Sequence, residues 1–267
     1  MEFQNKVFAV TGGGNGIGRE VVLLLLNSGA SVAAIDISED GLNQTMSLAK
    51  ENGKFLTLHK VDITNKSAVE ALPDLVLKAH NAIDGVINVA GIIQPFISVN
   101  ELKYEQIERV MNINFYGTLY MVKSFLPHLI KKETMTYVAN VSSMGGFLPV
   151  PGQSIYGASK AAVKLMTEGL YAELKDTNVR VSIILPGAVA TNITKNSNVE
   201  MKPIKGNVKS FKMTTAVKAA QIIVEGIEKN KLRIIVGGDS RFMDFLYRLC
   251  PKKAIDMIAE KMKSLIK

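Results

Sequence analysis

The sequence has few of the side chains that form disulfides or bind metals. Among its 267 residues, Cys250 is the single cysteine, and the three histidines, His59, His80 and His128, lie far apart along the chain. One cysteine excludes an intramolecular disulfide, and none of these residues has the spacing of metal ligands. We therefore expect neither a structural nor a catalytic metal.

Long uninterrupted apolar runs are also absent from the sequence. Polar residues interrupt each apolar stretch well before it reaches membrane-spanning length. The first residues, Met1 to Lys6, lead into a strand-like segment and do not form the basic and apolar regions of a secretion signal. We expect a soluble, cytoplasmic protein.

No repeat, low-complexity tract or proline-rich linker divides the chain. Its hydrophobic content of 47% is sufficient for a sizeable core, and its length is within the range of one α/β domain. We expect one compact domain over residues 1–240, followed by an extension over residues 241–267.

The net charge of +8 is concentrated in two segments. Residues 193–212 contain five lysines and one glutamate, and residues 241–267 contain seven basic and three acidic residues. The remainder of the chain is balanced. Because no recognition motif or aromatic–basic interleaving accompanies the charge, nucleic acid is not an expected partner.

Short β-branched runs alternate with amphipathic segments along most of the chain. Most of the runs are apolar throughout, as expected for strands that are covered on both faces of a parallel sheet. The expected strands are Val7–Thr11, Ser31–Asp36, Phe55–Val61, Gly85–Val89, Thr136–Val141, Val179–Leu185 and Leu232–Val236. The expected helices are Gly16–Ser28, Glu39–Asn52, Lys66–Ala79, Tyr104–Lys131, Ser154–Thr177 and Thr215–Lys229. This order predicts an α/β fold with a doubly wound parallel sheet of about seven strands and helices on both faces.

A glycine cluster joins the first strand to the first helix. Its sequence is Thr11-Gly12-Gly13-Gly14-Asn15-Gly16-Ile17-Gly18. Glycines allow a tight turn and a close approach to a pyrophosphate, and the helix N-terminus attracts its negative charge. A glycine cluster alone is weak evidence, but this one follows the first strand of an α/β series. We predict dinucleotide contacts from Gly12, Asn15, Gly16, Ile17 and Gly18.

Asp36 closes the second strand, where an acidic side chain can accept hydrogen bonds from an adenosine ribose and repel a 2′-phosphate. Neither Gly13 nor Ile37 supplies a basic group for such a phosphate. The pattern favours NAD over NADP, with Asp36 and Ile37 at the ribose. The alternative is that Asp36 only begins the turn to a helix capped by Ser38.

Turn-forming residues also end the third and fourth strands. Asp62 and Ile63 follow the third, and Asn88-Val89-Ala90-Gly91 ends the fourth. Each could be an ordinary strand end. Because the carboxyl ends of parallel strands share one edge, we expect Asp62, Ile63, Asn88, Ala90 and Gly91 to line a cofactor cleft.

Tyr156 and Lys160 lie four residues apart at the start of a predicted helix, and therefore on one face of it. An alcohol that loses hydride must also lose a proton, and a nearby ammonium favours the phenolate that can accept it. Such a pair is otherwise an ordinary solvated helix face. Ser143 follows the fifth strand and could hold the substrate oxygen, although residue type alone does not distinguish it from Ser142. Asn114 lies inside a helical run, where asparagine forms helix poorly.

These motifs together resemble the short-chain dehydrogenase/reductase family, in its compact single-domain branch, over nearly the whole chain. The matching segments are Thr11–Gly18, Asn88–Gly91, Asn114, Ser143, Tyr156–Lys160 and Pro186-Gly187. The family spacing of thirteen residues before the tyrosine selects Ser143 over Ser142. One departure is Val89, where many relatives have a second asparagine.

The resemblance implies a Rossmann-like fold and an NAD-dependent oxidoreductase that interconverts alcohols and carbonyl compounds. It implies that Tyr156 is the general acid/base and that Ser143 polarises the substrate oxygen. It further implies that Lys160 binds the nicotinamide ribose and lowers the pKa of Tyr156, and that Asn114 holds a water in a proton relay. Residues flanking the nicotinamide are expected to be Pro186, Gly187, Val189 and Thr191. Family members are usually homodimers or homotetramers.

Two basic segments lie outside these motifs. Residues 192–213 correspond to the family's substrate lid, and their lysines are compatible with an anionic substrate or with a solvated loop. In residues 241–267, Phe242, Phe245, Leu246 and Leu249 follow helical spacing, as do Ile255, Ile258, Met262 and Leu265. This basic amphipathic extension could cover the core or another subunit, the more common use, or lie peripherally on an anionic membrane.

Three other functions compete with the alcohol–carbonyl interpretation. A catalytically inactive dinucleotide-binding regulator is expected to lack Tyr156 or Lys160, and both are present. An extended-branch epimerase or dehydratase has a shorter glycine spacing and a larger C-terminal domain. An NADPH-dependent 3-oxoacyl-thioester reductase is disfavoured by Asp36.

Overall fold

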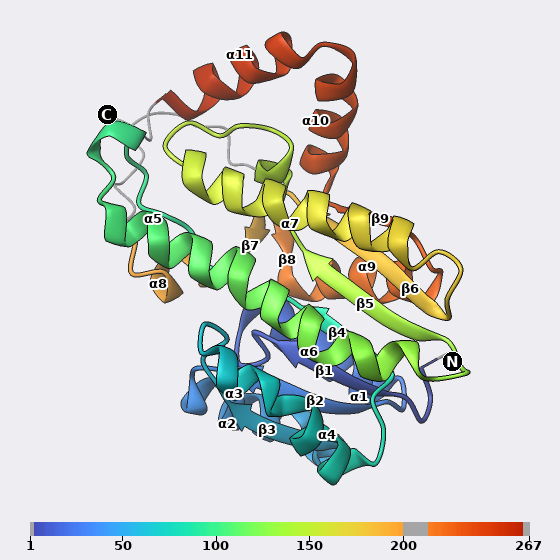
Figure 1. Cartoon of the computed structure of the whole chain (residues 1–267). Helices are drawn as coiled ribbons and strands as arrows, with labels where there is room; N and C mark the ends of the chain where they lie inside the picture. The colour runs from blue at the N-terminus through green and yellow to red at the C-terminus, as the bar shows by residue number, and fades with distance from the viewer. Residues whose placement is uncertain (1–2, 200–212, 264–267) are drawn as a thin grey trace.

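The computed structural model describes residues 3–199 and 213–263 (Figure 1). Its sheet has seven strands in the order β3-β2-β1-β4-β5-β6-β9, and every neighbouring pair is parallel. The strands are β1 (Val7–Thr11), β2 (Ser31–Asp36), β3 (Leu56–Lys60), β4 (Gly85–Asn88), β5 (Thr136–Val141), β6 (Val179–Pro186) and β9 (Arg233–Val236). The expected doubly wound sheet is confirmed. A separate two-strand pair, β7 (Val189–Ala190) with β8 (Thr214–Thr215), was not expected.

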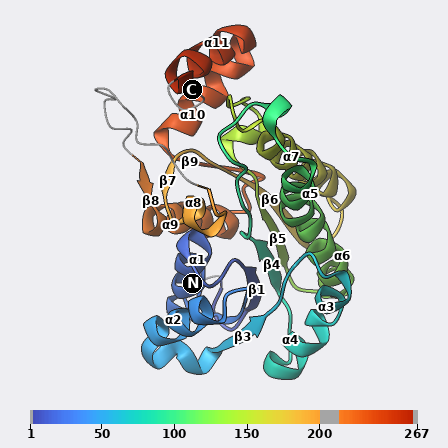
Figure 2. The ribbon, with the colours of Figure 1, turned by 90° about the vertical axis from the view of Figure 1, so that its left-hand side faces the viewer.

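Helices cover both faces of this sheet (Figure 2). One layer consists of α1 (Gly16–Asn27), α2 (Glu39–Ala49) and α9 (Ala216–Glu228). The other consists of α3 (Lys66–Glu70), α4 (Leu72–His80), α5 (Tyr104–Met111), α6 (Thr118–Ile130) and α7 (Ser154–Glu173). The remaining helices are α8 (Ile193–Asn196), α10 (Gly238–Leu249) and α11 (Pro251–Met262). Among the described helices, none is long and apolar enough to cross a membrane.

Two helices predicted as continuous are interrupted. The segment Lys66–Ala79 divides into α3 and α4 because Pro73 has no N–H to donate within the helix. The segment Tyr104–Lys131 contains a π-helical stretch at Asn112–Gly117, which joins α5 to α6. A single π turn inside a helix frequently accompanies a functional site, and this one contains Asn114.

The predicted helix Glu39–Asn52 also ends early. It stops at Ala49, because Lys50 has a φ of 51° and a 3₁₀ segment, Lys50–Phe55, continues the chain. A positive φ in a non-glycine residue is incompatible with continuing a right-handed helix. The break shortens α2 but leaves β3 in its predicted place.

Candidate active site

The β1–α1 turn forms a cradle of backbone amides. Gly12 and Gly16 have φ values of 72° and 53°, a region that side chains disfavour. A Cβ at Gly18 would collide with the carbonyl oxygen of Gly12, so the turn can close only with glycine there. The Asn15 side chain caps α1 by accepting from the Gly16 amide at 2.6 Å. The first turn of α1 presents the positive end of the helix dipole, which favours a phosphate.

The Asp36 carboxylate lies beside this cradle, at the end of β2. Its two oxygens accept from the amides of Gly14 and Ser38, each at 2.9 Å. These bonds fix the carboxylate at the cleft, and each oxygen retains a further lone pair for a hydroxyl donor. The bond from the Ser38 amide also stabilises the turn that leads from β2 into α2. Asp36 therefore begins this turn, as the alternative interpretation expected, in addition to lining the cleft.

Arg19 is a basic residue of this region that the sequence analysis missed. Its guanidinium donates to the hydroxyl of Thr45 at 3.1 Å, to the side chain of Gln44 at 3.1 Å, and to the carbonyls of Gly14 and Gly41. The sequence analysis looked for a basic residue only at positions 13 and 37. Arg19 directly follows Gly18, the last glycine of the cluster. Its donors are already engaged in joining α1 to α2.

A cleft of about 480 Å³ lies along the carboxyl edge of β1 to β4. Predicted cofactor residues that line it are Gly12, Asn15, Gly16, Ile17, Gly18, Asp36, Ile37, Asp62, Ile63, Ala90, Gly91 and Thr191. Residues that line it without having been predicted include Gly14, Arg19, Ser38, Gln44, Ile92, Arg109 and Asn192. The cleft therefore gathers the strand-end residues that the topology placed at one edge.

Six predicted cofactor residues are not on the wall of this cleft: Asn88, Tyr156, Lys160, Pro186, Gly187 and Val189. Asn88 is buried and donates to Asn140 at 2.8 Å, so its side chain joins β4 to β5. Gly187 packs against the Asp239 carboxylate, which accepts from the Ala188 amide at 2.7 Å. The turn containing Pro186, Gly187 and Val189 is therefore held from behind by the start of α10.

Ser143 and Tyr156 form the centre of the predicted catalytic group. Burial raises the pKa of Tyr156, and its hydrogen bond with Ser143 acts in the opposite direction. Ser142 points elsewhere, because its hydroxyl donates to the Lys160 carbonyl at 2.6 Å. The structure thus places Ser143, and not Ser142, against the tyrosine.

Lys160 is buried one turn further along α7. Its amine donates to the Val141 carbonyl at 3.0 Å, and burial lowers its pKa to about 8. A Cβ at Gly91 would lie 3.0 Å from the Lys160 Nζ and 3.1 Å from the Asn114 Oδ1. Gly91 therefore lines the cofactor cleft on one side and contacts the catalytic group on the other.

The Asn114 side chain makes three hydrogen bonds. Its oxygen accepts from the Ile92 amide, and its nitrogen donates to the Ile92 carbonyl and the Ser159 hydroxyl, all at 2.9 Å. These bonds tie the π-helical stretch to the segment after β4 and to α7. The Oδ1 atom and the backbone carbonyl, which accepts from the Thr118 hydroxyl at 2.8 Å, each keep one lone pair for a water.

Gln94 is a second polar residue that the sequence analysis missed. It is fully buried, and its Oε1 accepts from the amides of Ile155 at 2.8 Å and Tyr156 at 2.9 Å. Its Nε2 donates to the Gly152 carbonyl at 2.9 Å. Helix N-termini leave such amides without partners, so Gln94 satisfies the first turn of α7 and holds the backbone of Tyr156.

The described part of the predicted lid contributes Asn192, Ile193 and Asn196 to the wall of the cleft. α8 lies in it, and the Ser197 hydroxyl accepts from the Ile93 amide at 3.0 Å. The Ser197 carbonyl accepts from Arg109 at 3.2 Å. The lid lysines Lys202, Lys205, Lys209 and Lys212 lie outside the described residues.

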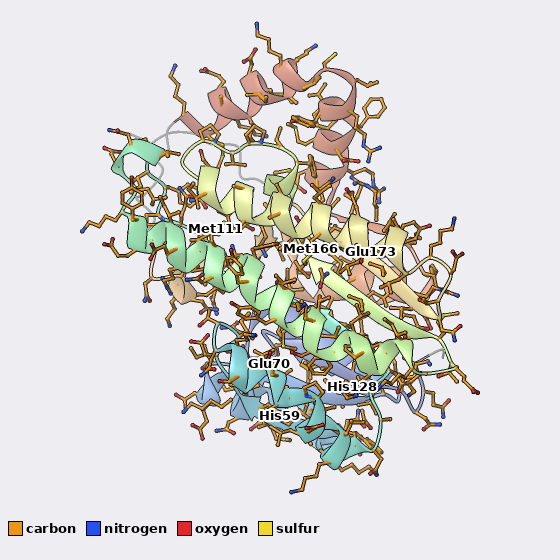
Figure 3. All side chains as sticks on the ribbon, in the orientation of Figure 1. His59, Glu70, Met111, His128, Met166 and Glu173 are labelled. Carbon is orange, nitrogen blue, oxygen red and sulfur yellow. The ribbon has the colours of Figure 1, made fainter. Side chains whose placement is uncertain are left out.

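The histidines are less scattered than the sequence suggested. His59 and His80 each hydrogen-bond to the Thr57 hydroxyl, at 2.9 and 2.8 Å. His128 lies on α6, and Figure 3 labels it together with His59. Within residues 3–199 and 213–263, no group of three or more histidine, cysteine or acidic side chains could hold a metal ion.

Comparison with known proteins agrees with this geometry. The family model described as short chain dehydrogenase matches residues 6–202. The chain is 33% identical over 254 residues to SadH of Mycobacterium tuberculosis, a protein named as an oxidoreductase, with coverage of 92% of this chain and 91% of SadH.

Two solved structures are similar over their whole length. A short-chain dehydrogenase/reductase from Burkholderia phymatum in complex with NAD superposes with a TM-score of 0.82 at 26% identity, covering 93% of this chain and 96% of that one. One from Burkholderia cenocepacia in complex with NADP superposes with a TM-score of 0.81 at 25% identity, covering 97% and 99%. The chain belongs to the short-chain dehydrogenase/reductase family of oxidoreductases.

Proposed function

We propose that this protein is an NAD-dependent oxidoreductase that interconverts an alcohol with a ketone or aldehyde. The observation that carries the proposal is the pairing of Tyr156 with the Ser143 hydroxyl, one helical turn from Lys160, whose amine lies against Gly91 of the cofactor cleft. In a single-domain member of an oxidoreductase family, this arrangement brings a proton-transfer group next to a dinucleotide site.

The cleft fits a dinucleotide in this chain. Its volume of about 480 Å³ is in the range of ligand pockets, and the glycines at 12, 16 and 18 leave the backbone open to a pyrophosphate. The amides at the start of α1 would hold the phosphates, and Asp36 would accept from the adenosine ribose. The nicotinamide, when bound, supplies the hydride chemistry.

The residues of this chain supply the proton and its positioning. Tyr156 would accept the hydroxyl proton when an alcohol is oxidised and return it when a carbonyl is reduced. Ser143 would donate to the same substrate oxygen and hold it against the phenol. Lys160, as the ammonium, would favour the phenolate form of Tyr156.

We propose NAD rather than NADP as the cofactor because of the negative charge of Asp36 at the expected position of the adenosine ribose. The Asp36 carboxylate lies at the cleft, and a 2′-phosphate there would meet its negative charge. Arg19 is a cation on the wall of the same cleft, but its guanidinium already donates to four acceptors between α1 and α2. Carboxylate repulsion therefore outweighs the attraction of an engaged arginine.

The proposal is tested by Tyr156→Phe, with turnover and NADH affinity measured separately. A screen of secondary alcohols, hydroxysteroids, sugars and hydroxyacyl compounds with NAD first finds a substrate. We expect the substitution to lower kcat by about 10²–10⁴ and to leave NADH binding nearly unchanged. Tyr171→Phe is the matched control, because Tyr171 is an exposed tyrosine of the same helix. Retained turnover in Tyr156→Phe would refute the assignment.

A further inference from the structure

The two C-terminal helices, α10 and α11, pack against the segment that joins Ser143 to Tyr156. We refer to them as the C-terminal helix pair; it lies at one end of the molecule (Figures 1 and 2). Met243, Ala254 and Ile258 form a buried cluster with Leu148, and Phe147 packs against it. Residues 147 and 148 lie in the connection between Ser143 and Tyr156. The inner side of the helix pair therefore covers the segment between Ser143 and Tyr156, and covering the core is one of the predicted uses of the extension.

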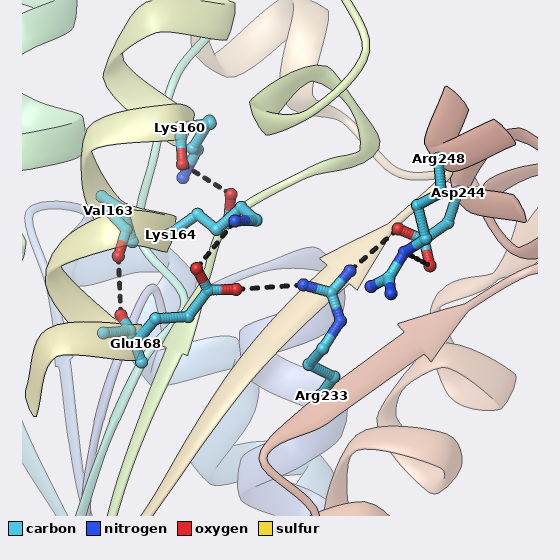
Figure 4. A network of polar contacts seen from close by, with 9 residues as sticks. Lys160, Val163, Lys164, Glu168, Arg233, Asp244 and Arg248 are labelled. Carbon is cyan, nitrogen blue, oxygen red and sulfur yellow. Dashed lines mark hydrogen bonds and ion pairs between the residues drawn. The ribbon is translucent and has the colours of Figure 1, made fainter. Parts of the chain in front are cut away.

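The helix pair is fixed firmly to the sheet. Arg233 on β9 bonds Glu168 of α7 at 3.0 Å and Asp244 of α10 at 2.8 Å (Figure 4). The Ser240 hydroxyl donates to the Leu185 carbonyl at 2.9 Å. These bonds hold α10 in one orientation, so its outer side faces a constant direction.

That outer side carries three large apolar side chains. Phe242, Phe245 and Leu249 are 56%, 63% and 64% exposed, and we refer to them as the apolar stripe. Their spacing of three and four residues places them on one face of α10. The buried residues Ser240, Met243 and Asp244 occupy the opposite side. A packed core therefore does not account for the stripe.

Most of the exposed charges around the stripe are basic. On α10, Arg241 and Arg248 are exposed, whereas Asp244 is buried. Lys252 and Lys253, both exposed, follow at the start of α11. The exposed Asp256 lines the same hollow as Lys252 and Lys253, and Glu260, further along α11, pairs with Lys263 at 3.8 Å. The end of the molecule that bears the stripe thus combines apolar and basic groups.

We propose that the apolar stripe docks on the surface of an anionic lipid bilayer. A helix that buries aromatic and aliphatic side chains in the headgroup region, with arginine and lysine beside them, meets both requirements of such a surface. A two-fold contact between copies of this chain is disfavoured, because it would place the same arginines and lysines of both copies against one another. Docking would place the wall around Phe147 close to the lipid.

Vesicle sedimentation of the full chain tests this proposal independently of any enzymatic activity. The vesicles consist of phosphatidylcholine alone or of phosphatidylcholine mixed with phosphatidylserine. We expect the wild type to bind only the mixed vesicles. Phe242→Ser combined with Phe245→Ser should weaken binding at least about tenfold. Lys252→Gln and Lys253→Gln should weaken it about fivefold for each charge removed.

Matched substitutions elsewhere serve as controls. Leu165→Ser and Val217→Ser remove exposed apolar groups from α7 and α9, and Lys66→Gln and Lys229→Gln remove exposed basic groups. All four should bind the mixed vesicles as the wild type does. Absence of wild-type binding, or equal loss in the controls, overturns the proposal. The proposal is also overturned if the Phe242→Ser, Phe245→Ser variant binds vesicles as the wild type does and differs from it only in a smaller molecular mass in solution. That result would identify a second copy of this chain as the partner of the apolar stripe.

Discussion

Burial of the Lys160 ammonium lowers the free energy of unfolding of this protein. It is 3% exposed, and burial lowers its pKa to about 8 from an ordinary value of 10.5. The unfolded chain therefore binds more protons between about pH 8 and 10.5, and the free energy of unfolding should rise as the pH rises through that window. Below it both states are protonated, and the folded state bears the full cost of about 3 kcal/mol.

Lys160→Met should therefore stabilise the protein near neutral pH while abolishing turnover. We expect a gain of about 2 kcal/mol in the free energy of unfolding, since the lost hydrogen bond to Val141 offsets about 1 kcal/mol. The gain should shrink towards pH 10. Urea denaturation at several pH values measures it, with the exposed Lys175→Met as the control. A difference that does not change with pH would contradict this account of Lys160.

Gln94 should position Tyr156 through the backbone. Gln94→Met keeps the size of the side chain but leaves the Ile155 and Tyr156 amides without their acceptor. We expect kcat to fall by about tenfold to a hundredfold with little change in NADH affinity. Gln94→Glu should restore part of kcat, because a carboxylate still accepts from both amides. It should also move the pH profile of kcat upward, because a negative charge disfavours the phenolate.

Ser182→Ala controls for loss of stability alone, since the buried Ser182 hydroxyl on β6 donates to the Lys231 carbonyl, two residues before β9. If Ser182→Ala lowered kcat as much as Gln94→Met, positioning by Gln94 would be refuted.

At this scale the sequence predicts Tyr156, Lys160 and Ser143 from spacing along the chain. It does not predict Gln94, because its partners lie about sixty residues away and depend on the path of two loops.

At the scale of elements, Arg233 joins three parts of the fold. It lies on β9 and forms ion pairs with both α7, which carries Tyr156 and Lys160, and α10. Arg233→Met should lower the free energy of unfolding by about 1–3 kcal/mol, since the side chains involved are only partly exposed and Asp244 keeps a second bond to Arg248. Urea denaturation measures the change. A loss no larger than in Lys66→Met, which breaks an exposed pair on α3, would show that the network contributes little.

The predictions are within one residue at each end for the strands and for α1 and α9, whereas α2 and α7 end three and four residues early and the other two predicted helices are divided. Strand ends follow a change from apolar to turn-forming residues, as at Asp36. Helix ends depend on backbone detail: Pro73 separates α3 from α4, and Lys50 adopts a positive φ. The π-helical stretch at Asn112–Gly117 coincides with long-range bonds from the Asn114 side chain to Ile92 and Ser159, and no local sequence pattern predicts it.

At the scale of the whole molecule, the cofactor cleft joins segments from distant parts of the chain. It is lined by the ends of β1 to β4, by Arg109 of α5 and by Ile193 and Asn196 of α8. A ligand that binds only this assembled state stabilises the whole fold, by about 2.7 kcal/mol at a hundredfold excess over its Kd. Cofactor preference is therefore measurable as thermal stability, without a known substrate.

NADH should raise the Tm more than NADPH at equal concentration, because the Asp36 carboxylate accepts from ribose hydroxyls and repels a 2′-phosphate. Asp36→Ala combined with Ile37→Arg should reverse that order, since it removes the repulsion and adds a cation at the rim of the cleft. Asp40→Ala is the matched control: Asp40 lines the same cleft, but its carboxylate makes neither of the bonds that fix Asp36 there. It should leave the order unchanged. A wild type that NADPH stabilises more than NADH would show instead that Arg19 governs the ribose end, and that the engaged guanidinium can exchange its backbone partners for a phosphate.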